Sequence, residues 1–172
     1  MEEAEKLFLL ISDRAPKDPK VHFYLGSIYN ELKKEALSEK ELKSALELDP
    51  NFAEALNSLG YIYVEENKNL GQAEKLIKKA VHLEPDNGAY IDSLGWLYFK
   101  LGKTEEALKL LERACVLMQD EVIFDHLGDV YFKLKDFPKA KINWQKSLGL
   151  DAAQKGVKEK LEALNKNASC TK

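Results

Sequence analysis

The residues that could carry out chemistry are few, and they lie far apart in the sequence. Asp125 and His126 are adjacent and have the side-chain types of an acid–base dyad. Neighbours on a helix point about 100° apart, so these two side chains are not expected to face each other. His22 and His82 lie in distant segments, and a metal site shared with His126 would need long-range convergence. We therefore predict no catalytic residues and no metal site.

Other signatures of catalysis are missing from the sequence. It has no glycine-rich phosphate loop, no His-Glu-x-x-His, no Cys-x-x-Cys and no nucleophile elbow around a serine. Cys115 lies in an apolar periodic stretch and Cys170 in a polar tail, and two such cysteines do not make a disulfide framework. The sequence therefore predicts a protein that is not an enzyme and that needs no cofactor.

Charge and hydrophobicity argue against nucleic-acid binding and membrane insertion. The 172 residues include 29 acids and 26 bases, a net charge of -3, without the basic patch of a nucleic-acid-binding protein. The acidic N-terminus lacks the basic region of a signal peptide, and the apolar run 7–11 is too short to span a bilayer. We expect a soluble chain with no nucleic-acid partner and no direct membrane insertion, cytoplasmic as it stands.

The elements that position these residues form a repeat. The motif Leu-Gly-x-x-Tyr occurs four times, at intervals of about 34 residues. The four copies begin at Leu25, Leu59, Leu94 and Leu127. Glycine inside a helix costs about 1 kcal/mol relative to alanine, so a recurring glycine needs a packing reason. We expect a second helix to approach it closely.

A second pattern follows each copy and has a small residue, a large apolar residue four later, and a small residue three after that. The four sets are Ser38, Leu42, Ala45; Ala73, Ile77, Ala80; Ala107, Leu111, Ala114; and Ala140, Trp144, Ser147. We expect the first small residue of the second helix to face the glycine of the first helix. Ser38 and Ser147 stand where alanine is expected, at positions that we interpret as partly packed.

The two patterns together resemble the tetratricopeptide repeat (TPR) family, whose motif is W-x₂-L-G-x₂-Y…A-x₃-F…P. The resemblance implies an all-α fold, a right-handed α-solenoid of TPR helix pairs. The predicted repeats are 19–52, 53–87, 88–120 and 121–152, preceded by the second helix of an incomplete repeat at 1–15. A capping helix is predicted at 153–166 and a disordered tail at 167–172.

The predicted N-terminal helix is apolar on all sides, which is typical of a buried helix. Two explanations stay open: the chain is part of a longer array, or Leu7, Leu9 and Leu10 pack against another copy and form a homodimer.

The resemblance also predicts a binding surface, because the first helices of TPR pairs line a concave face. The positions expected to be exposed there carry aromatic and acidic side chains. Our candidates for the groove are Phe23, Asn57, Tyr61, Asp92, Trp96, Lys100, Asp125 and Asp129. For Phe99 and Phe132, packing between neighbouring first helices and exposure in the groove are equal alternatives. Such a surface suits a peptide or helix with apolar and basic residues.

The predicted function is therefore a protein–protein interaction scaffold or adaptor. The alternatives are a self-assembly module that uses the N-terminal helix, or a regulatory part of a larger protein. The segment from Ala89 to Trp96, followed by the segment from His126 to Tyr131 and by Trp144, also resembles the C-terminal repeats of large bacterial envelope TPR adaptor lipoproteins. That resemblance implies a periplasmic location.

Overall fold

The computed structural model describes residues 17–169, and this part of the chain contains nine α-helices and no strand. The chain divides into two compact units, Met1–Pro85 and Asp86–Lys172. The predicted helix at 1–15, with Leu7, Leu9 and Leu10, lies outside the described residues. Homodimer formation through these leucines therefore stays a prediction.

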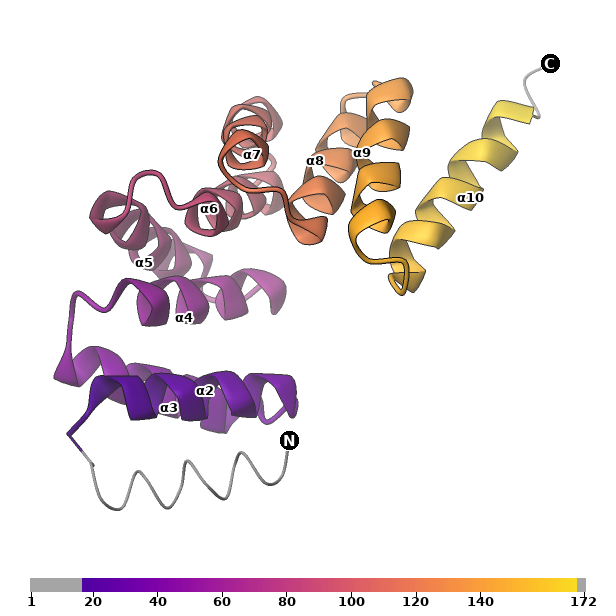
Figure 1. Cartoon of the computed structure of the whole chain (residues 1–172). Helices are drawn as coiled ribbons and strands as arrows, with labels where there is room; N and C mark the ends of the chain where they lie inside the picture. Colours follow the sequence, from indigo (N-terminus) through magenta and orange to yellow (C-terminus); the bar gives the residue numbers. More distant parts are fainter. Residues whose placement is uncertain (1–16, 170–172) are drawn as a thin grey trace. The chain divides into compact units, whose positions relative to one another are not determined.

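Unit 1 contains two helix pairs. They are α2 (Pro19–Glu31) with α3 (Glu35–Leu48), and α4 (Ala53–Glu65) with α5 (Leu70–Leu83). The two helices of each pair pack on each other, and α4 also packs on α3 and α2 (Figure 1).

Unit 2 contains two further pairs and one more helix. These are α6 (Gly88–Lys100), α7 (Thr104–Leu117), α8 (Glu121–Lys133), α9 (Phe137–Leu150) and α10 (Lys155–Ser169). The helix α8 packs on α7 and α6, and α10 packs on α9. Because α10 ends at Ser169, helix replaces the disordered tail predicted for 167–169, and the rest of that tail lies outside the described residues.

The first helix of every pair ends in the same hydrogen-bonded turn. A backbone N–H three residues after the last residue of the helix donates to the carbonyl of the motif tyrosine, as in a Schellman motif. The four bonds are Lys34 to Tyr29 (2.8 Å), Lys68 to Tyr63 (2.9 Å), Lys103 to Tyr98 (2.9 Å) and Asp136 to Tyr131 (2.9 Å). This turn requires a left-handed residue, which is Lys33, Asn67, Gly102 or Lys135. The motif tyrosine therefore marks where the chain reverses.

The motif glycines mark a close approach of the second helix, as predicted, and the large residue of that helix supplies the nearest side-chain atoms. A Cβ atom on Gly95 would lie 2.8 Å from Cγ of Leu111, and one on Gly26 would lie 2.8 Å from Cγ of Leu42. The same holds for Gly60 with Ile77 and for Gly128 with Trp144. The glycine thus makes room for the large residue of the second helix. The predicted small residue also lies beside the glycine in two pairs, since a Cβ atom on Gly60 would lie 3.3 Å from the carbonyl oxygen of Ala73 and the Ser38 hydroxyl donates to the carbonyl of Gly26.

The two serines that replace alanine are not partly packed, as predicted, but fully buried. Each hydroxyl donates a hydrogen bond to a carbonyl of the preceding helix, Ser38 to Gly26 (2.7 Å) and Ser147 to Glu121 (2.7 Å). A buried hydroxyl needs such a partner. The serines therefore tie the two helices of a pair together.

Glu39 links the two repeats of unit 1. Its carboxylate accepts hydrogen bonds from Lys43 Nζ (2.7 Å), the Tyr63 hydroxyl (2.9 Å) and Lys68 Nζ (3.2 Å). The bond from Lys43, and after it those from Tyr63 and Lys68, outweigh the opposing effect of burial and lower the pKa of Glu39 to about 2. A carboxylate that accepts several hydrogen bonds favours its charged form.

Candidate functional site

The groove candidates of unit 1 are half-buried. The ring of Phe23 packs against the ring of Phe52, with centroids 5.2 Å apart. Asn57 and Tyr61 are also half-buried on α4. The Oδ1 atom of Asn57 is buried and accepts no hydrogen bond within the part of the chain that the structure describes.

In unit 2, two of the groove candidates are not exposed as we predicted. Asp92 is 5% exposed and Trp96 is 8% exposed, because α8 packs on the face of α6 that carries them. Of the remaining candidates in unit 2, Asp125 and Asp129 are half-buried and only Lys100 is exposed.

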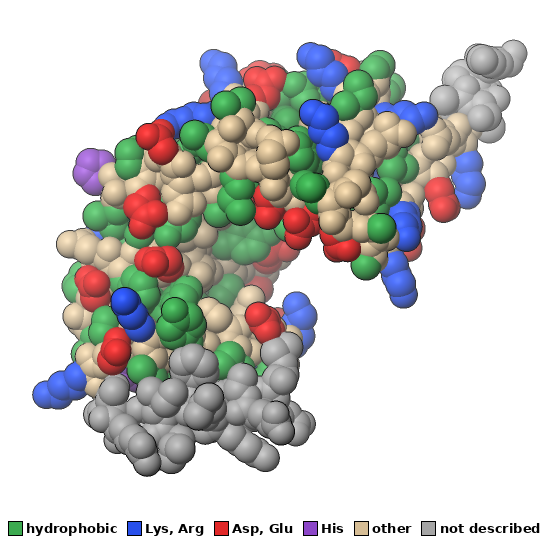
Figure 2. All heavy atoms as spheres, viewed as in Figure 1, with side chains coloured by type: hydrophobic (Ala, Val, Ile, Leu, Met, Phe, Trp, Pro, Cys, Tyr) green, Lys and Arg blue, Asp and Glu red, His purple; other side chains and the backbone are tan. Residues whose placement is uncertain are grey.

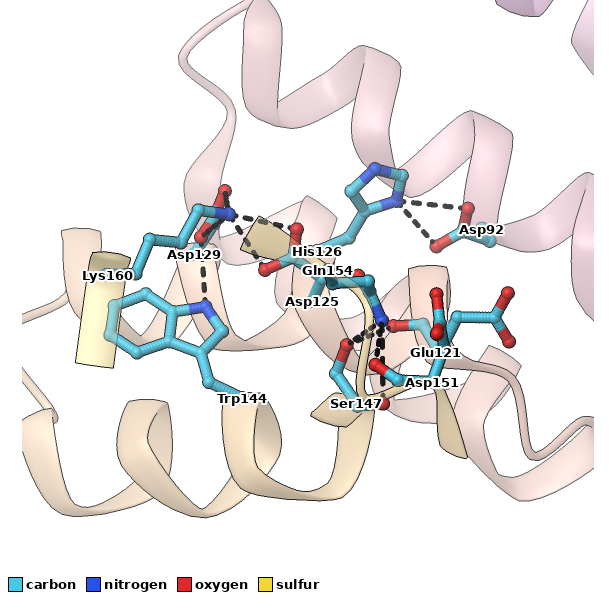
Figure 3. A network of polar contacts seen from close by, with 10 residues as sticks. All are labelled: Asp92, Glu121, Asp125, His126, Asp129, Trp144, Ser147, Asp151, Gln154 and Lys160. Carbon is cyan, nitrogen blue, oxygen red and sulfur yellow. Dashed lines mark hydrogen bonds and ion pairs between the residues drawn. The ribbon is translucent and has the colours of Figure 1, made fainter. Parts of the chain in front are cut away.

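Asp92 and His126 form a pair that joins α6 to α8 (Figure 3). The Nδ1 atom of His126 lies 3.0 and 3.1 Å from the two carboxylate oxygens of Asp92, and it donates to them. The imidazole ring is stacked on Trp96, with centroids 4.0 Å apart and an angle of 9° between the planes. His126 therefore bonds to the preceding repeat and not to its neighbour Asp125. With both side chains only 7% exposed, this pair has little access to a substrate.

Trp96 continues this cluster towards the surface. It stacks on Phe99 with centroids 5.1 Å apart, and the Nζ atom of Lys100 lies 4.7 Å from its ring centroid. A cation over an indole face is attracted by the negative charge of the ring. Trp96 is thus held by contacts within α6 and from α8.

A second polar cluster joins α8, α9 and α10 (Figure 3). Lys160 Nζ donates to both carboxylates, at 2.7 Å from Asp125 and 2.7 Å from Asp129. The indole N–H of Trp144 donates to Asp129 at 3.0 Å. Burial raises the pKa of Asp129. Burial alone would lower the pKa of Lys160, but the hydrogen bonds from it to Asp125 and Asp129 outweigh this effect, and its pKa is raised.

The two clusters follow one rule. In each, an aspartate three residues before a motif glycine pairs with a base two helices further along the chain. The base follows 34 residues later for Asp92 and His126, and 35 residues later for Asp125 and Lys160. Lys160 on α10 therefore takes the place that His126 has on α8. The acids that we assigned to a groove connect neighbouring helices, and the repeat-length spacing between acid and base is the sequence signal that could have revealed this.

Next to Lys160 the surface is hollowed into an apolar pocket of about 370 Å³. Its lining comes from α6, α8, α9 and α10, and consists of Phe99, Asp129, Phe132, Lys133, Trp144, Lys160, Ala163 and Leu164. Phe99 is half-buried, and Phe132 is 43% exposed and lies at the opening in contact with Phe137 and Trp144. Phe132 thus presents an accessible aromatic ring beside a preformed hollow.

Residues 17–169 contain no group of His, Cys, Asp or Glu side chains that could hold a metal ion. None of the described helices is both long enough and apolar enough to span a membrane. On the face that Figure 2 shows, Lys and Arg side chains are spread singly and do not gather into a patch.

Comparison with solved structures finds the same fold in several other proteins. A thermophilic TPR protein of Thermus thermophilus is similar with a TM-score of 0.79 and 18% identity, over 93% of this chain and 88% of that one. The pilF protein of Pseudomonas aeruginosa is similar with a TM-score of 0.75 and 25% identity, over 88% and 69%. A MamA RS-1 double mutant has a TM-score of 0.69 and 19% identity, over 90% and 87%.

Among curated proteins, none matches this sequence. Three family models, each described as a tetratricopeptide repeat, match residues 19–52, 41–75 and 88–120. Together they cover more than half of the chain. The chain therefore belongs to the tetratricopeptide repeat family, whose repeats form scaffolds for protein–protein interaction.

Proposed function

We propose that the protein is an adaptor that binds a segment of a partner protein, and that apolar side chains of this segment enter the pocket of unit 2. The observation that carries the proposal is the pocket of about 370 Å³ lined by Phe99, Phe132, Trp144 and Leu164. An apolar cavity of about 150 Å³ is enough to hold benzene. The pocket therefore has room for about two side chains of a helical or extended segment.

The rim of the pocket also suits a protein partner. Phe132 contacts Phe137 and Trp144, with ring centroids 5.5 and 5.6 Å away, and it remains substantially exposed. Aromatic side chains in partly desolvated pockets often dominate the binding energy of an interface. Its neighbours hold Phe132 in place, so little conformational entropy would be lost when a partner binds.

The charge of the partner has to be considered for each unit separately. In unit 2, Asp92, Asp125 and Asp129 are each hydrogen-bonded to a base of the neighbouring helix, so they offer little to a basic partner. In unit 1, Glu31 and Glu54 are exposed, so a basic segment of a partner could still pair with them. The candidates Phe23, Asn57 and Tyr61 remain proposed contacts of unit 1.

Selection of short peptides from a phage-displayed random library on the full chain tests the proposal. The selected peptides should share large apolar residues and should lose at least about tenfold in affinity on Phe132→Asp. Ile142→Asp is the matched control, because Ile142 is 50% exposed on α9 and does not line the pocket. Peptides that bind both variants as tightly as the wild type would show that the pocket is not the binding site.

A further inference from the structure

The charged side chains around the pocket point to the chemistry of the partner. We infer that the segment bound by unit 2 is acidic, with Asp or Glu residues beside its apolar anchors, and that Lys100 and Lys133 recognise it. The inference rests on the proposed function, because the anchors place the acidic residues beside these two lysines.

The first step of the argument is that the acids near the pocket are already occupied. Lys160 donates to both oxygens of Asp125, at 2.7 and 2.9 Å, and to Asp129 as well. A basic side chain of a partner would have to displace Lys160 to reach either carboxylate. That displacement would break the hydrogen bonds that hold α10, which forms one wall of the pocket, against α8.

The second step concerns two lysines that stand in equivalent positions of neighbouring repeats. Lys100 is the last residue of α6 and Lys133 the last residue of α8, and each directly follows a phenylalanine of the pocket, Phe99 or Phe132. Both lysines are exposed, and within residues 17–169 neither takes part in an ion pair. Lys133 itself lines the pocket, whereas Lys100 lies over Trp96.

The third step compares partner charges. An acidic side chain next to a bound anchor can pair with Lys133 or Lys100 without displacing an ion pair of unit 2, whereas a basic one meets two like charges. Complementary charges at the rim of an interface raise the association rate and exclude wrong partners. The lysines also complement the negative ends of the α6 and α8 helix dipoles, a structural role that would not depend on a partner.

Three synthetic helical peptides of about 15 residues test the inference. All carry the same leucine and phenylalanine four positions apart, and they differ only in flanking residues, which are glutamate, glutamine or lysine. Their affinities for the full chain are measured by fluorescence anisotropy at low and at physiological ionic strength. We expect the acidic peptide to bind about tenfold more tightly than the neutral one at low salt, and the basic peptide to bind most weakly.

The double variant Lys100→Gln/Lys133→Gln should bring the acidic and neutral peptides to within about twofold of each other and leave the affinity for the neutral peptide unchanged. Lys109→Gln/Lys158→Gln removes the same charge from exposed positions of unit 2 that do not line the pocket, and it should keep most of the preference. A purely structural role of Lys100 and Lys133 would leave the preference intact.

Equal binding of the acidic and neutral peptides, tightest binding of the basic peptide, or a preference that survives in Lys100→Gln/Lys133→Gln overturns the inference and leaves the pocket standing. A different result contradicts the proposed function itself. In that case none of the peptides binds, or Phe132→Asp does not weaken the neutral peptide, and the inference falls with the proposal.

Discussion

Replacing Gly95 by alanine should destabilise the protein, although alanine is the better helix former. At an open helical position the change gains about 1 kcal/mol. Here the new Cβ atom would lie 2.8 Å from Cγ and 3.0 Å from Cδ2 of Leu111, well inside the usual contact distance of about 3.5–4.0 Å. Leu111 is fully buried and has no room to retreat. Overpacking costs about 1–3 kcal/mol, and so close a contact with a fully buried side chain belongs in the upper part of that range, at about 2–3 kcal/mol. After the gain of about 1 kcal/mol in helix propensity, we expect a net loss of about 1–2 kcal/mol.

A matched control separates packing from helix propensity. Gly149 lies in α9, and a Cβ atom on it would meet nothing within 4 Å. Gly149→Ala should therefore stabilise the protein by about 0.5–1 kcal/mol. The contrast in sign between the two substitutions is the diagnostic result.

The partner of Gly95 can be tested by a double-mutant cycle. Leu111→Ala removes the atoms that the new Cβ would strike, at a cost of about 2–5 kcal/mol. In that background Gly95→Ala should be neutral or stabilising, which gives a coupling energy of about 2 kcal/mol. Free energies of unfolding come from urea titrations followed by circular dichroism. Our account of the helix pair is refuted if Gly95→Ala is as stable as the wild type with an unchanged m-value, or if the effects of the two substitutions are additive. The larger substitution Gly95→Leu should destabilise the protein more than Gly95→Ala.

Three further predictions concern single features. Glu39→Gln should lower the free energy of unfolding by about 1–2 kcal/mol at neutral pH. Because the pKa of Glu39 is lowered to about 2, this contribution is present above its ordinary pKa near 4.5 and is lost as the pH falls towards 2. Urea titrations should therefore give the same free energy of unfolding for both proteins near pH 2. Gly102→Ala should destabilise by about 1 kcal/mol and Lys135→Gly should stabilise by a similar amount, since both positions are left-handed; melting temperatures that shift in the same direction would contradict this. Burial raises the pKa of the Cys115 thiol to about 12, which leaves little reactive thiolate. In a Cys170→Ser variant, Cys115 should therefore react with a disulfide reagent at least about 100-fold more slowly in the native protein than in urea. Equal rates in the two conditions would show that the thiol is not protected.

The helix pairs could be predicted from the sequence because the repeat pattern states both the period and the apolar face. The side chain that lies nearest to the motif glycine could not be predicted, although the large residue that supplies it was identified. In a helix, long side chains lean back over the preceding turn, so Leu111 covers surface on the N-terminal side of its own Cα atom. The pattern gave the spacing of Ala107 and Leu111 but not the direction in which the leucine side chain leans.

The exposure of Asp92 and Trp96 was predicted wrongly for a different reason. Their place within one repeat indicates the direction in which a side chain points, but burial depends on how closely the next first helix follows. Here α8 brings His126 against both of them, at hydrogen-bond distance from Asp92 and in stacking contact with Trp96. A contact between repeats depends on two residues about one repeat length apart, so it cannot be predicted from the pattern of a single repeat.

Lys160 accounts for two features of unit 2 that were predicted separately, a C-terminal cap and an acidic groove. By bonding to Asp125 and Asp129 as a base of a following repeat would, it seats α10 against α8 and α9. The seated helix then supplies Ala163 and Leu164 to the wall of the pocket. The same bonds that complete the pocket also occupy its aspartate, which leaves Lys133 as the exposed charged residue of the pocket lining. The apolar hollow and the exposed lysine beside it therefore have a common origin in the packing of α10 on α8 and α9.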